Sequence, residues 1–174
     1  IDKKYWLVGG TGSFFSYNYD FTTAGQPTLS GKLTDINLSA NVGYFLFDKF
    51  AAGVRPGINS VKSRGLNTAS AGTKSVAIFI GPFARYYFTT ETQSVRPIIQ
   101  GNFNFLSVRQ KVGSISSTTT GTNFFVGGGA AMFISKNVSI DALMGYDRTK
   151  YKNFDGSGGF AFNIGCQVYI NKGQ

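Results

Sequence analysis

The sequence predicts an all-β protein, an eight-stranded antiparallel up-and-down transmembrane β-barrel that forms one domain over residues 1–174. Three observations predict it. Apolar and polar residues alternate over segments at least as long as the 9–11 residues that cross a bilayer as a tilted strand. Short and long connections alternate along the chain. Charged residues make up only 14% of it, well below the roughly 25% of soluble domains.

The segment 138–152 shows the alternation most clearly. Its even positions are apolar from Val138 to Tyr146 and basic from Arg148 onward, whereas the odd positions are mostly small or polar. Strands of soluble proteins usually span about 5–6 residues. A strand of this length with one apolar face is therefore expected to face lipid on that side.

Eight such segments follow one another. Tight connections are expected at 47–50, 89–94 and 135–137, and longer ones at 22–33, 67–75, 114–122 and 153–159. Short turns face the periplasm in bacterial outer-membrane barrels, so an even strand count predicts an outer-membrane protein with both termini periplasmic. The expected strands are 4–19, 33–47, 50–64, 75–88, 95–111, 122–134, 138–152 and 159–171.

The alternation assigns side chains to two faces. Lipid-facing positions include Trp6, Val8, Phe14, Ile36, Leu38, Val42, Ile99, Phe103, Met144, Phe162, Ile164 and Cys166. Lumen-facing positions include Asp35, Asn41, Gln100, Asn102, Asn104, Asp147 and Gln167. Five aromatic residues are also expected to fill the lumen, namely Phe45, Phe47, Phe79, Phe83 and Tyr87.

Three segments carry a resemblance to a known kind of protein. The stretches GYFLFDKFAAG (43–53), GPFARYYF (81–88) and AAMFISKNVSIDALMGY (130–146) resemble the small outer-membrane β-barrels common in Bacteroidetes. These barrels are similar to the OmpX, OmpW and OmpA-barrel type. The resemblance implies a fold and a location rather than an activity, because such barrels serve diverse functions.

The sequence argues against catalysis, cofactors and metals. It contains no histidine, which is the usual general acid or base near neutral pH. The lone Cys166 lies in a lipid-facing phase, and the glycine-rich stretches 9–14 and 126–131 lie inside strands with no helix after them. We therefore expect a protein that is not an enzyme and has no cofactor.

The net charge of +9 raises the question of nucleic acid. The basic residues, however, recur at strand ends in phase with the apolar face, and the aromatic residues follow a period of two. This pattern builds a barrel wall, so we expect no nucleic-acid partner.

Charged residues in the lumen phase form the first candidate site. Arg55, Arg85 and Asp141 all point inward near the expected periplasmic turns. Buried charges are stable only when they are paired and hydrogen-bonded. An internal ion-pair network is the simpler interpretation, and a charged constriction for a small solute is the alternative.

Basic residues at the outer strand ends form the second candidate site. Each continues a lipid-facing series, so they would form a girdle just outside the apolar band. They are either solvated, snorkelling strand ends or contacts for lipopolysaccharide phosphates, and the two interpretations overlap. The nine residues are Lys32, Lys62, Arg64, Lys74, Arg109, Lys111, Arg148, Lys150 and Lys152.

Three functions fit these observations. The first is a non-enzymatic structural or interaction protein with outer-membrane lipid and lipopolysaccharide as partners, or an accessory subunit of an outer-membrane assembly, which would add other outer-membrane proteins as partners. The second is a narrow channel for small or apolar solutes, like the OmpW type. The third is a soluble lipocalin-like barrel, which would place its apolar residues inside.

Overall fold

The computed structural model describes residues 4–21, 29–65, 72–88, 94–112, 115–152 and 154–171. Within these ranges no helix is long and apolar enough to cross a membrane. The strands are β1 (Tyr5–Phe21), β2 (Leu29–Phe47), β3 (Phe50–Val54), β4 (Gly57–Gly65), β5 (Thr73–Ile80), β6 (Pro82–Tyr87), β7 (Val95–Val112), β8 (Ile115–Ser135), β9 (Val138–Tyr151) and β10 (Phe154–Asn171).

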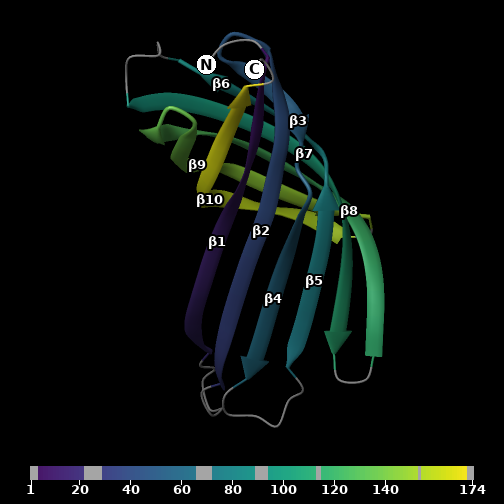
Figure 1. Cartoon of the computed structure of the whole chain (residues 1–174). Helices are drawn as coiled ribbons and strands as arrows, with labels where there is room; N and C mark the ends of the chain where they lie inside the picture. Colours follow the sequence, from purple (N-terminus) through teal and green to yellow (C-terminus); the bar gives the residue numbers. More distant parts are fainter. Residues whose placement is uncertain are drawn as a thin grey trace.

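The strands close into one antiparallel ring (Figure 1). β3 and β4 both pair with β2 and together take one position in the ring. β5 and β6 both pair with β7 and likewise share one position, so the ten strands fill eight positions. β1 closes the ring by pairing with β10. The prediction of an eight-stranded antiparallel up-and-down barrel is confirmed.

Two expected strands are interrupted in the middle. Pro56 has no amide hydrogen, and its carbonyl oxygen accepts a hydrogen bond from the Ala40 amide at 2.9 Å. On the neighbouring strand, the Gly81 carbonyl oxygen accepts a hydrogen bond from the Arg55 amide at 2.8 Å. A Cβ at Gly81 would lie 1.8 Å from the Phe103 carbonyl oxygen, so only glycine allows this close approach. The ranges 50–64 and 75–88 therefore each form two short strands.

Two of the expected long connections are wrong. β8 already begins at Ile115 and β10 at Phe154, so most of 114–122 and of 153–159 is strand. The β7–β8 hairpin stays paired from Val95 to Val112. Polar residues at these positions belong to strands that continue beyond the apolar band rather than to loops. The expected connections 22–33, 67–75 and 89–94 lie partly outside the described residues; of the described parts, 29–33 belongs to β2 and 73–75 to β5, so these two connections are shorter than predicted.

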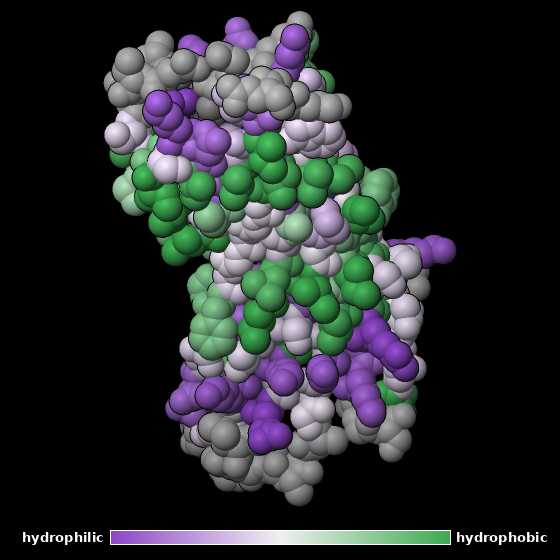
Figure 2. Space-filling view, viewed as in Figure 1, coloured by the Kyte–Doolittle hydropathy of each residue, from purple (hydrophilic) through white to green (hydrophobic). Residues whose placement is uncertain are grey.

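The exposed face is apolar, as the alternation predicts. Ile140 and Met144 of β9 are exposed, while Asp141 and Leu143 between them are buried. Figure 2 shows hydrophobic side chains across the middle of the molecule and hydrophilic side chains toward both ends. This is the reverse of a soluble barrel and matches a barrel that spans a bilayer, which excludes the lipocalin-like alternative.

Phe47 contradicts the expected phase. The register between β2 and β3 shifts between Phe45 and Phe47. Phe45 is completely buried, whereas Phe47 is 66% exposed and packs near Phe50, with ring centroids 6.3 Å apart. A bulge of this kind moves the following side chain to the other face, so the prediction that Phe47 fills the lumen is wrong.

The seam between the first and last strands is only partly closed. β1 pairs with β10 from Tyr5 to Gly12 and no further, although β1 stays paired with β2 as far as Phe21. Beyond Gly12 the two strands diverge, as Figure 1 shows. The barrel thus has a closed inner half at the end of the short turns and an outer half that is split along this seam.

Candidate functional site

The buried side chains of the closed half lie in successive layers across the lumen. Nearest the short turns, Phe45, Tyr87 and Tyr169 form an aromatic layer with ring centroids 5.7–6.2 Å apart. Leu7, Phe83, Ile98, Ala131 and Leu143 belong to the same buried cluster. This part of the lumen is therefore filled by side chains.

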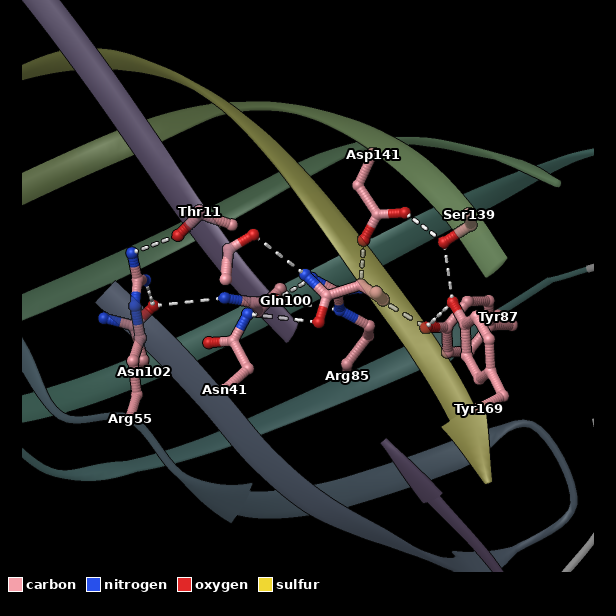
Figure 3. Close-up of polar contacts among 12 residues, drawn as sticks. Thr11, Asn41, Arg55, Arg85, Tyr87, Gln100, Asn102, Ser139, Asp141 and Tyr169 are labelled. Carbon is pink, nitrogen blue, oxygen red and sulfur yellow. Dashed lines mark hydrogen bonds and ion pairs between the residues drawn. The ribbon is translucent and has the colours of Figure 1, made fainter. Parts of the chain in front are cut away.

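An ion pair spans the next layer (Figure 3). Arg85 from β6 donates through Nη1 to Asp141 Oδ2 of β9, and both residues are about 1% exposed. The guanidinium also donates to Gln100 Oε1 through Nε at 2.8 Å and through Nη2 at 2.6 Å. The structure thus brings together Arg85 and Asp141, two of the three lumen charges expected from the sequence.

A chain of hydroxyl groups supports Asp141 from the other side. Ser139 Oγ donates to Asp141 Oδ1 at 2.6 Å and lies 2.9 Å from the hydroxyl of Tyr169. That hydroxyl lies 2.9 Å from the hydroxyl of Tyr87. Sequence reasoning missed Ser139 and Tyr169, although both lie in the lumen phase of their strands.

Arg55 differs from its expected role. Among the described residues no carboxylate contacts it; instead Nε donates to Ser39 Oγ at 2.9 Å, Nη1 to Asn102 Oδ1 at 2.8 Å and Nη2 to Thr11 Oγ1 at 2.9 Å. Asp141 lies one layer nearer the short turns and is already bound to Arg85. Arg55 therefore joins the network only through neutral neighbours, since Gln100 Nε2 donates to the same Asn102 oxygen at 3.5 Å.

Beyond Arg55 the lumen widens, on the side away from the short turns, into a cavity that we call the vestibule. Its volume is about 760 Å³. Its floor includes Arg55 and Asn102, and Phe15 of β1 and Phe160 of β10 line it where those strands separate. The lumen of the described barrel is thus a blind cavity closed by the layers below it.

The nine rim cations are all exposed, each at the outer end of its strand. They form two groups rather than an even ring. The first group lies on β2, β4, β5 and β7, where Lys32 lies directly opposite Arg64 and Arg109 lies two residues from Lys111. The second group lies at the end of β9. We name two sets for use below: the lysine row is Lys62, Lys74 and Lys111, and the β9 group is Arg148, Lys150 and Lys152.

The lysine row brings like charges together on neighbouring strands. Lys62 of β4 pairs with Lys74 of β5, and Lys74 pairs with Lys111 of β7. Like charges directly opposite each other destabilise a sheet. Beside the row is a groove of about 620 Å³ whose charged lining residues are Lys32, Lys62, Arg64 and Lys74. This arrangement favours an anion held by several cations at once.

Other kinds of site find little support in the described residues. No group of three or more His, Cys, Asp or Glu side chains there is placed to hold a metal ion. Cys166 is exposed on the lipid-facing side of β10. Asp141 is fully buried, and its contacts are Arg85 and Ser139.

Comparison with solved structures shows the fold. The crystal structure of Neisserial surface protein A matches at TM-score 0.54 with 19% identity, covering 97% of this chain and 98% of that chain. The N-terminal β-barrel domain of Pseudomonas aeruginosa OprF matches at TM-score 0.54 with 14% identity, covering 98% and 100%. The outer membrane protein OprG of the same bacterium matches at TM-score 0.54 with 12% identity, covering 98% and 97%. No protein-family model matches the chain, and a search of curated protein sequences finds no match.

Proposed function

We propose that this chain is a non-enzymatic protein of a bacterial outer membrane whose closed barrel acts as an anchor and whose outer rim holds lipopolysaccharide. The observation that carries the proposal is that side chains fill the lumen near the short turns while cations crowd the opposite rim. The filled part of the lumen leaves little room for a transported solute, and the crowded cations need an anionic partner. A structural or interaction role follows, alone or as an accessory subunit beside other outer-membrane proteins.

The proposed orientation rests on the turns. The tight turns at Asp48–Lys49 and Lys136–Asn137 lie at the same end as Tyr5 and Asn171, the outermost strand residues near the termini. Short turns face the periplasm in outer-membrane barrels, so both termini are proposed to be periplasmic. The rim cations then lie in the outer leaflet. Kinship with the Bacteroidetes barrels stays a prediction.

The proposed lack of conduction rests on the buried layers. A pore through this barrel would have to move the Arg85–Asp141 pair and the aromatic layer of Phe45, Tyr87 and Tyr169 aside. Barrels of eight strands have interiors just wide enough for side chains to fill. In planar bilayers we expect no stepwise conductance from the purified chain, and steady single-channel currents would favour the narrow-channel alternative.

The proposed lipopolysaccharide contact rests on the lysine row and its groove. Each cation near an anionic membrane surface contributes about 1 kcal/mol, and the effect falls off within a Debye length. Replacing the three lysines of the row by glutamine should reduce the lipopolysaccharide that co-purifies with the folded barrel, most strongly at low salt. Unchanged co-purification would leave the row as solvated strand ends.

A further inference from the structure

The vestibule has features that neither the anchor nor the rim uses. It is lined by polar side chains from opposite walls of the ring and lies on the side away from the short turns. Its volume of about 760 Å³ falls within the ~300–1,000 Å³ of small-molecule sites. We propose that the vestibule binds a neutral saccharide of one or two sugar rings.

The polar groups of the vestibule are fixed in place before any ligand arrives. On the wall formed by β2 and β4, Asn59 Nδ2 donates to Asp35 Oδ1 at 2.6 Å. On the opposite wall, Asn123 Nδ2 bridges Asp147 Oδ1 at 2.8 Å and Thr149 Oγ1 at 3.0 Å. Asn123 Oδ1 in turn accepts from Asn104 Nδ2 at 3.0 Å. Each contact holds an amide or carboxylate in one orientation, so less side-chain entropy is lost when a ligand binds.

Acceptor capacity is left over at the bottom of this arrangement. Asn104 is 3% exposed, yet its Oδ1 has no hydrogen-bond partner. Such a buried acceptor is costly unless a donor reaches it. From the described residues, Asp35 and Asp147 each accept at Oδ1 alone. The vestibule therefore offers the Oδ2 atoms of Asp35 and Asp147 to a ligand that brings several hydroxyl donors, and a small rotation of the buried Asn104 amide would add a third acceptor.

Aromatic rings stand beside these acceptors. Phe79 from β5 and Tyr151 from β9 line the cavity inside the ring, and Phe15 lines it at the split seam. A sugar ring carries hydroxyl groups around its edge and apolar C–H groups on its faces. Amide and carboxylate oxygens next to aromatic rings match both parts of such a molecule.

Charge and polarity disfavour the other ligand classes. The charged lining residues are Asp35, Asp147 and Arg55, and all three nitrogens of Arg55 already donate to neutral oxygens. An anion would meet two carboxylates, and three of the five N–H groups of Arg55 are already bound to neutral oxygens. An apolar ligand would strip water from the amide groups without replacing their hydrogen bonds. A polyhydroxylated neutral ligand avoids both costs.

The test is a titration of the full chain, folded in lauryldimethylamine oxide because that detergent has no sugar headgroup. Maltose, lactose, cellobiose and N-acetylglucosamine are added at millimolar concentrations, with spermidine and inorganic phosphate as the cationic and anionic comparisons. Binding is followed by calorimetry and by the NMR signals of the asparagine side-chain amides. We expect at least one saccharide to saturate and to shift the Asn104 and Asn123 amides while leaving the indole signal of Trp6 unchanged.

Two variants and their matched controls locate the binding. Ala161→Trp places a ring inside the vestibule and should abolish binding, whereas Ala142→Trp on the lipid-facing side of β9 should not change it. Asp147→Asn should weaken binding about tenfold or more, the range for a lost hydrogen bond to a charged group, and the exposed Asp20→Asn should not. Failure of every saccharide to saturate, binding of spermidine or phosphate alone, or binding insensitive to Ala161→Trp would each overturn the proposal. None of these outcomes depends on whether the rim holds lipopolysaccharide.

Discussion

The Arg85–Asp141 pair offers a quantitative test of how the lumen is stabilised. Asp141→Asn leaves the buried guanidinium of Arg85 with only neutral acceptors, Gln100 Oε1 and the Tyr87 hydroxyl. Breaking a buried pair by removing one partner costs about 3–5 kcal/mol, because the other charge stays buried without compensation. Arg85→Met leaves Asp141 with the Ser139 hydroxyl, so a similar loss of unfolding free energy is expected.

Combining the two changes removes both charges. If the changes were independent, the losses would sum to about 6–10 kcal/mol. We expect the loss of unfolding free energy in the double variant to be smaller than this sum by about 2 kcal/mol or more, which lies within the coupling range of contacting residues. The assay is denaturant unfolding of the barrel in lipid vesicles, followed by the fluorescence of Trp6, the single tryptophan of the chain.

A matched substitution controls for the general effect of losing a carboxylate. Asp147 lines the vestibule and accepts from Asn123 instead of from an arginine, so Asp147→Asn should change stability much less than Asp141→Asn. Additive losses in the double variant would refute the pairing argument. Equal losses for the two aspartates would refute the claim that burial beside Arg85 sets the cost.

Three further predictions concern the lipid-facing side, the cationic rim and the β1–β10 seam. Met144→Arg on the lipid-facing side should cost about 2–4 kcal/mol near the bilayer midplane, and tolerance of the charge in vesicle unfolding would mean that the assigned phase is inverted. Neutralising the β9 group should reduce lipopolysaccharide retention less than neutralising the lysine row, because the row alone lies beside the cationic groove; equal retention losses would contradict this ranking. In hydrogen exchange, every second amide of residues 13–20 in β1 should exchange fast while those of Leu7 and Val8 stay protected, and uniform protection would mean that the seam with β10 is closed.

The sequence alone predicted the wall of the barrel well, because alternation is a local property. A period of two assigns Ile99 outward and Gln100 inward without any knowledge of partners, and both lie as expected. The same alternation predicted that Arg85 and Asp141 are in contact, because two inward-pointing charges at similar depth in a narrow lumen lie within reach of each other.

Features that depend on non-local geometry were missed. The bulge that turns Phe47 outward changes the phase by one residue and has no clear signature in composition. The acceptors of Arg55 come from β1, β2 and β7, so their arrangement depends on the register of distant strands. The extent of the β1–β10 seam joins the two ends of the chain, and no short-range pattern specifies it.

The split seam explains why the open cavity and the exposed cations lie in the outer half, away from the buried Arg85–Asp141 network. Backbone groups inside a bilayer must be paired, and around the closed half of the ring they are. On β1 the pairing with β10 ends at Gly12, the last outward apolar side chain is Phe14, and Ser16, Asn18 and Asp20 follow on that face. The closed half, with its filled lumen, therefore meets the pairing requirement for spanning a membrane. In the outer half the edges of β1 and β10 separate, and this half holds the vestibule and the cationic rim open to ligands.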